Sequence, residues 1–211
     1  MKEPWNSLEI TKVVVGTLTP VLIFILGYAV NESIRSRERA MNEIESRRQR
    51  SEAREAAVQN LSRFIYERRA RAEMLLSAFR RNASLNEIIE RKKLYDEAYV
   101  RWNTNHQANL LLVRQVLRDR QYSEFESLVE FLLVKQIFAP LDTCLTTAFD
   151  QRAHGSAVIK TLEDCSATAL VQRALDCGYA LTDELFKLSG EEPDSSTRNV
   201  AREAIEARCT N

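Results

Sequence analysis

Helix-breaking residues are scarce in this chain. Its 211 residues include five glycines and four prolines, and none of either lies between residues 28 and 139. A stretch without such breakers that is rich in Ala, Leu, Glu and Arg is typical of long helices. We find no sustained alternation of apolar and polar residues, which would indicate strands. The sequence therefore predicts an all-α fold.

Motifs for catalysis and cofactor binding are also missing. The sequence contains no G-x-S-x-G, no glycine-rich phosphate loop and no C-x-x-C. Its two histidines, His106 and His154, do not follow a Glu by three residues, as the ligands of a di-iron bundle would. We therefore expect a protein that is not an enzyme and has no metal and no other cofactor.

The one long hydrophobic run is Val13 to Val30, which is 18 residues without a charge. A helix of that length can cross a bilayer core with slight tilt or help from flanking residues. The alternative is a secretory signal peptide, since Gly27-Tyr28-Ala29 offers a cleavage pattern, but the run is long for one and arginines follow it. We predict a transmembrane helix over residues 12–31.

Positive charge is concentrated after this run. Residues 31–81 carry thirteen Arg and eight Glu, whereas residues 82–211 carry fifteen basic and twenty acidic groups. This asymmetry predicts a single-pass protein, in a bacterial inner membrane by our interpretation, whose C-terminal domain is cytoplasmic. It favours anionic lipid over nucleic acid as a partner. The candidate headgroup contacts are Arg35, Arg37 and Arg39.

Apolar stripes divide the rest of the chain. Residues 32–55 have almost none, whereas four helical stripes follow, joined by short connections that favour antiparallel neighbours. The predicted fold is a transmembrane helix that continues into a stalk and an antiparallel up-down-up-down four-helix bundle. The segments are a short extracytoplasmic tail (1–11), the transmembrane helix (12–31), an Arg/Glu-rich stalk (32–55), the bundle (56–189), and a linker with a short tail helix (190–211).

Local signals place the helix ends. The first helix should end near Arg81, and Asn82-Ala83 should make the turn. Two pairs with capping-box spacing, Ser84 with Glu87 and Ser123 with Glu126, predict the starts of the second and third helices. We expect a kink at Pro140 in the third helix and a fourth helix from about Lys160 to Ser189.

Pairing the helices across their turns suggests a buried ion pair. Arg68 interrupts an apolar stripe of the first helix, and the turn at residues 82–83 brings it level with Glu97. A buried Arg68–Glu97 pair would fix the register of the two helices. The more common arrangement is an arginine whose long stem crosses the apolar face while its head reaches solvent.

A second polar layer is predicted in the second helix. Trp102, His106 and Asn109 share one face, and the turn near residue 121 brings His106 level with Gln136. This layer could bind a small ligand or respond to pH. Alternatively, it is a hydrogen-bond network that specifies the register of the helices.

The cysteines give no clear site. Cys144 and Cys165 should approach each other across the last turn, while Cys177 and Cys209 have no predicted neighbour. In the cytoplasm all four should be reduced, so we interpret Cys144 and Cys165 as two small buried apolar residues rather than a redox or metal site.

Two functions of different classes fit these observations. The first is a membrane-anchored, non-enzymatic interaction protein that acts as a scaffold, a regulator or a subunit of a membrane complex, and that could form homo-oligomers. The second is a membrane-tethered sensor whose bundle binds a ligand near Trp102 and relays the change through the stalk. In the stalk, Ile34, Met41 and Ile44 have the spacing of a heptad seam. A weak parallel coiled coil and a simple solvated spacer are both compatible with this pattern.

Overall fold

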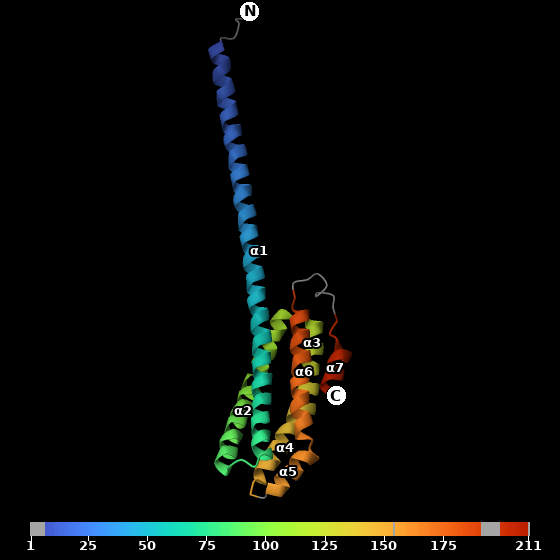
Figure 1. Cartoon of the computed structure of the whole chain (residues 1–211). Coiled ribbons are helices and arrows are strands. Elements are labelled where there is room, and N and C mark those ends of the chain that lie inside the picture. Colours follow the sequence, from blue (N-terminus) through green and yellow to red (C-terminus); the bar gives the residue numbers. More distant parts are fainter. Residues whose placement is uncertain (1–6, 154, 191–198, 211) are drawn as a thin grey trace, which may run out of the picture. The chain divides into compact units, whose positions relative to one another are not determined.

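The computed structural model describes residues 7–153, 155–190 and 199–210, and all regular structure in these ranges is helical, which confirms the all-α prediction (Figure 1). The chain divides into two compact units, residues 1–50 and residues 51–211. The helices are α1 (Ser7–Arg80), α2 (Leu85–Val116), α3 (Asp119–Leu128), the π-helix η1 (Val129–Phe138), α4 (Ala139–Asp150), α5 (Gly155–Asp164), α6 (Ala167–Leu188) and α7 (Arg202–Thr210).

The first unit overturns the membrane prediction. Within the described part of the chain, we find no helix that is both long and apolar enough for a bilayer crossing. Most side chains of the run Val13–Val30 lie outside the described residues. Farther along, between residues 32 and 50, the arginines and glutamates of α1 are all exposed, and such side chains are costly in hydrocarbon. The predicted transmembrane helix over 12–31 and the single-pass, inner-membrane localisation with a cytoplasmic C-terminal domain are therefore wrong.

Other predicted segments fall partly outside the description. Of the predicted tail (1–11), residues 1–6 lie outside the described residues, and so do residues 191–198 of the predicted linker. The predicted tail helix is present as α7, with Ile205 and Cys209 buried.

The turn between α1 and α2 is as the sequence predicts. Asn82 adopts a left-handed conformation with φ of 50°, which Asn tolerates better than most residues. The hydroxyl of Ser84 then accepts a hydrogen bond from the backbone N–H of Glu87 at 3.3 Å. The predicted Ser84 cap is thus confirmed, and α2 begins at Leu85.

The third helical segment differs from the prediction. It begins at Asp119, four residues before Ser123, and the side-chain oxygen of Gln121 accepts from the backbone N–H of Arg118 at 3.3 Å. The predicted Ser123 cap is wrong because the chain already turns at Leu117 and Arg118, both extended.

A π-helix, η1, lies immediately before Pro140, where we expected a kink. The backbone N–H of Ala139 bonds to the carbonyl of Val134, five residues earlier. Proline cannot donate a backbone hydrogen bond, and its ring crowds the preceding helical turn. The wider turn of a π-helix is one way for a helix to accommodate this disruption.

The predicted fourth helix is divided in two. Ser166 has φ of 53°, a left-handed conformation that cannot continue a right-handed helix. The chain therefore forms α5 before this residue and α6 after it.

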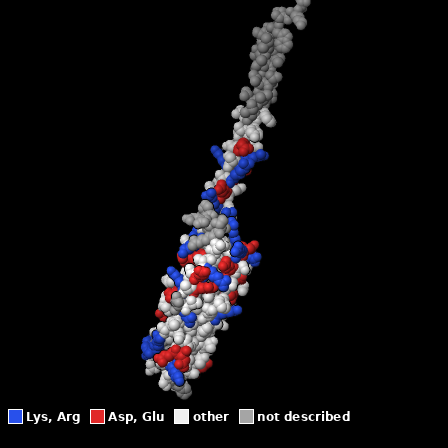
Figure 2. All heavy atoms as spheres, turned by 90° about the vertical axis from the view of Figure 1, so that its right-hand side faces the viewer, with Lys and Arg blue, Asp and Glu red and all other residues white. Residues whose placement is uncertain are grey.

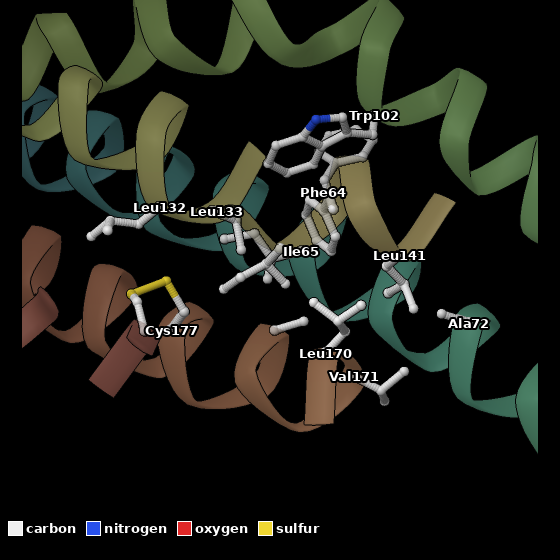
Figure 3. Close-up of a cluster of buried hydrophobic side chains, with 14 of the residues drawn as sticks. Phe64, Ile65, Ala72, Trp102, Leu132, Leu133, Leu141, Leu170, Val171 and Cys177 are labelled. Carbon is white, nitrogen blue, oxygen red and sulfur yellow. A yellow bond between two sulfur atoms is a disulfide. The ribbon is translucent and has the colours of Figure 1, made fainter. Parts of the chain in front are cut away.

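In the second unit the chain reverses direction after α1, after α2 and again between α4 and α5 (Figure 1). Its core combines residues from the last part of α1 with α2, η1, α4 and α6, and Figure 3 shows Trp102 and Ile65 within this cluster. Gly178 allows a close approach of α6 to α1, because a Cβ atom at that position would lie 2.8 Å from Cγ2 of Ile65.

All four cysteines form disulfides, contrary to the expectation that they are reduced. One disulfide joins Cys144 of α4 to Cys165, and their Cα atoms are 6.0 Å apart. The other joins Cys177 of α6 to Cys209 of α7, with Cα atoms 4.4 Å apart. The approach of Cys144 to Cys165 was predictable from the last turn, whereas docking of α7 on α6 brings Cys209 to Cys177. Disulfides of this kind persist in oxidising compartments.

We expect reduction of the disulfides to lower stability. A disulfide that closes a loop of this length stabilises a protein by about 2–4 kcal/mol, mainly by restricting the unfolded chain. Urea melts with and without a reductant should therefore have different midpoints, and the oxidised protein should show no reactive thiol in a denaturing assay. The Cys177→Ala/Cys209→Ala variant lacks one of the two disulfides. A reductant should therefore shift its urea midpoint by less than it shifts that of the wild type. Four reactive thiols in the freshly purified, unreduced protein would contradict both disulfides.

Candidate functional site

An ion pair between a buried arginine and a partly buried aspartate joins two helices of the second unit. Arg68 of α1 is only 2% exposed, and its guanidinium pairs with the Oδ2 atom of Asp142 in α4. The buried alternative for Arg68 is thus the one observed, but the partner is not the predicted Glu97. Glu97 lies 3.9 Å from Arg101, its neighbour one turn along α2. Pairing residues across the turn between α1 and α2 gave the wrong partner, because the side chain of Arg68 reaches α4 rather than α2.

Tyr95 completes this cluster from α2. Its buried hydroxyl donates to Oδ1 of Asp142, so each carboxylate oxygen has a donor from a different helix. Burial raises the pKa of the Asp142 carboxyl above its ordinary value, although Arg68 and the Tyr95 hydroxyl partly oppose this. Burial also raises the pKa of Tyr95, and the neighbouring Asp142 carboxylate adds to that effect. We call Arg68, Tyr95 and Asp142 the charged cluster.

Aromatic rings surround the guanidinium of Arg68. Its Cζ atom lies 4.2 Å from the ring centre of Phe138, 5.0 Å from Tyr99 and 5.8 Å from Trp102. Such positions allow cation–π attraction, which is stronger for a desolvated cation. The rings therefore compensate part of the cost of burying this charge.

The predicted layer around Trp102 continues from the charged cluster. Trp102 is 1% exposed and lies with its ring centre 5.1 Å from that of His106 and 5.3 Å from Phe138. His106 contacts Glu130 of η1, with Nε2 and Oε1 2.6 Å apart. The structure thus brings Trp102 and His106 together. The sequence predicted Gln136 beside His106, but the observed partner is Glu130, six residues earlier in η1. Gln136 itself is half-buried.

Three buried donor atoms in or beside this layer have no hydrogen-bond partner among the described residues. They are Nε of Arg68, Nε1 of Trp102 and Nδ2 of Asn109. Buried polar atoms are normally paired with protein or ordered water. All three are N–H donors, so a group that complements them must offer acceptors such as water, carbonyl or carboxylate oxygens.

Sequence reasoning missed two acidic residues of this site, Asp142 and Glu130. Asp142 is the only acidic residue between Glu130 and Asp150 and follows the apolar residue Leu141. A lone carboxylate in an apolar stretch could have pointed to Arg68, the lone cation in the stripe of the first helix. Glu130 lies in the π-helix η1, and Asp142 follows it in α4. Each wide turn of a π-helix shifts the side chains by one position, which simple helical spacing does not anticipate.

No family model, curated protein or solved structure matches the chain. The charged cluster joins α1, α2 and α4 through the carboxylate of Asp142, and both oxygens of that carboxylate accept hydrogen bonds.

Proposed function

We propose that this chain is a non-enzymatic interaction protein. In this proposal, residues 56–189 act as an up-down-up-down four-helix bundle and the stalk mediates self-association. The charged cluster suits such a role, because a buried polar group that must be satisfied favours one arrangement of the helices over others. Both oxygens of Asp142 are occupied by donors, so the carboxylate supports architecture rather than proton transfer.

The observation that carries the proposal is an exposed apolar seam on the stalk. Ile34, Met41 and Ile44 are 50%, 69% and 66% exposed and follow the a-to-a and a-to-d spacing of a heptad. A polar helix of this length is marginal alone in water. Pairing with a second copy of α1 would cover these side chains. The seam is interrupted at Arg48 and Ser51, so we expect a weak association.

Charges on the surface agree with a protein partner. On the face shown in Figure 2, basic and acidic side chains of the second unit are intermixed. Such a surface fits a protein better than a nucleic acid, which prefers a concentrated basic patch. The exposed Arg35, Arg37 and Arg39 remain candidates for contacts with anionic headgroups, a prediction that rests on the sequence.

Cysteine cross-linking tests the stalk association. Because the native cysteines are all in disulfides, an introduced cysteine is the only free thiol. Met41→Cys lies on the seam and should give a covalent dimer under mild oxidation of the full chain. Glu43→Cys lies off the seam and should give several-fold less. Equal yields at both positions, or no dimer at either, would leave the stalk as a simple spacer.

A ligand-binding sensor is the second candidate, and a specific observation favours it. The unpartnered N–H donors of Trp102 and Asn109 lie seven residues apart on α2 and are both buried. A small molecule with acceptor oxygens would satisfy them. In this alternative, occupation of the layer would change the contact between His106 and Glu130, and through η1 the packing of α4 and α6.

A further inference from the structure

A groove in the second unit shares no lining residue with the charged cluster. It is formed by the last turns of α1 and the first turns of α6 and has a volume of about 360 Å³. Leu76 and Val171, which are both buried, form its apolar part. This volume is at the lower end of the range for small-molecule pockets.

Three arginines line this groove from α1: Arg69, Arg80 and Arg81. Only one carboxylate, that of Glu73, lines it with them, and it pairs with Arg69 at 2.6 Å. Arg81 pairs with Glu87, which lies outside the lining. The groove therefore carries an excess of positive charge.

Arg80 is the source of that excess. Its guanidinium donates to the hydroxyl of Thr168 in α6, and no carboxylate among the described residues is seen to pair with it. Its place in the last turn of α1 is favourable because the carboxyl end of a helix attracts cations. One bond to a neutral hydroxyl uses only one of the five N–H donors of a guanidinium. Nearby, the buried Nε atom of Arg69 also has no hydrogen-bond partner within the part of the chain that the structure describes.

We propose that this groove binds a phosphate-type oxyanion on a small molecule. The planar fork of Arg80 matches two oxygens of a phosphate group. The hydroxyls of Ser77 and Thr168, which also line the groove, can donate to further oxygens. Leu76 and Val171 then contact the apolar part of the ligand. This site is separate from the stalk, so its test and the cross-linking test can fail independently.

Inorganic pyrophosphate is a suitable probe. Calorimetric titration of the full chain at constant ionic strength should detect binding to the wild type. Arg80→Ala should weaken that binding by about tenfold or more, as expected for loss of a charge-assisted hydrogen bond. Arg80→Lys keeps the charge but loses the fork, so its binding should be intermediate. Arg120→Ala removes an exposed arginine of α3 outside the groove and should change the affinity by less than about twofold, since a distant surface charge is largely screened.

A second arm separates a soluble phosphate from a lipid headgroup. Vesicles with phosphatidic acid are compared with vesicles of phosphatidylcholine alone. Binding of pyrophosphate that depends on Arg80 supports a soluble ligand. Vesicle binding that depends on Arg80, without binding of pyrophosphate, assigns the same chemistry to a headgroup. Equal binding by wild type, Arg80→Ala and Arg120→Ala in both arms, or no binding in either, would overturn the site. Circular dichroism melts of the variants, which alter exposed side chains, should match the wild type.

Discussion

Asp142→Ala should destabilise the second unit by about 3–5 kcal/mol, because it leaves the Arg68 charge buried without its partner. The same substitution leaves the buried Tyr95 hydroxyl without an acceptor, which adds to the loss. A domain has only about 5–15 kcal/mol of total stability. Urea denaturation followed by circular dichroism should therefore show a large fall in the midpoint for Asp142→Ala.

Two comparisons make this result specific. Asp150→Ala removes an exposed aspartate from the end of the same helix and should change the free energy of unfolding by less than about 0.5 kcal/mol. The variant Arg68→Met/Tyr95→Phe/Asp142→Leu removes all the polar groups of the cluster together. It should recover most of the lost stability, because apolar replacement of a buried ion pair is often neutral or stabilising. Equal stability of Asp142→Ala and Asp150→Ala would contradict a buried pair.

The pH dependence of stability has a definite sign at Asp142. Burial raises the pKa of its carboxyl in the folded protein, so the folded state holds this proton more tightly than the unfolded state does. The contribution of Asp142 to stability is therefore present in full below the unfolded-state pKa and declines as pH rises through the raised folded-state pKa. Comparison of Asp142→Asn with the wild type across this acidic window should isolate the decline.

Trp102→Ala should destabilise the second unit by about 3–5 kcal/mol, through lost transfer energy and the cavity that remains. The side chain is 1% exposed and contacts Phe138 edge-on. Thermal and urea melts followed by circular dichroism should show a much lower midpoint or an unfolded protein. In a Trp5→Phe background, the Trp102 fluorescence should be blue-shifted in the folded state and should shift to the red on denaturation.

Control variants separate the contribution of the Trp102 side-chain volume to stability from that of its indole N–H group. Trp102→Phe keeps most of the ring and removes an N–H that has no partner among the described residues, so it should cost less than Trp102→Ala. Phe131→Ala removes an aromatic residue of η1 that is half exposed and should cost less still. Emission typical of solvated indole, together with a normal melt of Trp102→Ala, would show that Trp102 is not part of the core.

Much of the fold could be predicted from local physical chemistry. The lack of glycine and proline over residues 28–139 predicted long helices. Asn82 and Ser84 predicted the first turn. Asn tolerates the left-handed conformation that ends one helix, and the Ser hydroxyl caps the start of the next. Arg68 and Trp102 stood out as candidates because each has an unusual side chain within an apolar stripe.

Three predictions were wrong, and the last two of them depend on distant parts of the chain. The long apolar run suggested a membrane helix, whereas no helix in the described part of the chain could cross a membrane. The cysteines were expected to be reduced because of the predicted compartment, and the structure pairs all four. The partner of Arg68 was sought on the adjacent helix, whereas α4, later in the chain, supplies it.

The sequence by itself determined that this protein is helical, where its first turn lies and which apolar faces form its core. These properties depend on neighbouring residues through helix propensity, capping and periodicity. Only the tertiary structure decided that Asp142 joins Arg68 and Tyr95, that Glu130 contacts His106, and that Cys209 reaches Cys177. The first two depend on η1, which contains Glu130 and precedes Asp142, because its wide turns offset side chains from simple helical spacing. The third depends on where α7 docks. Contacts between residues far apart in sequence follow from packing, which local patterns do not encode.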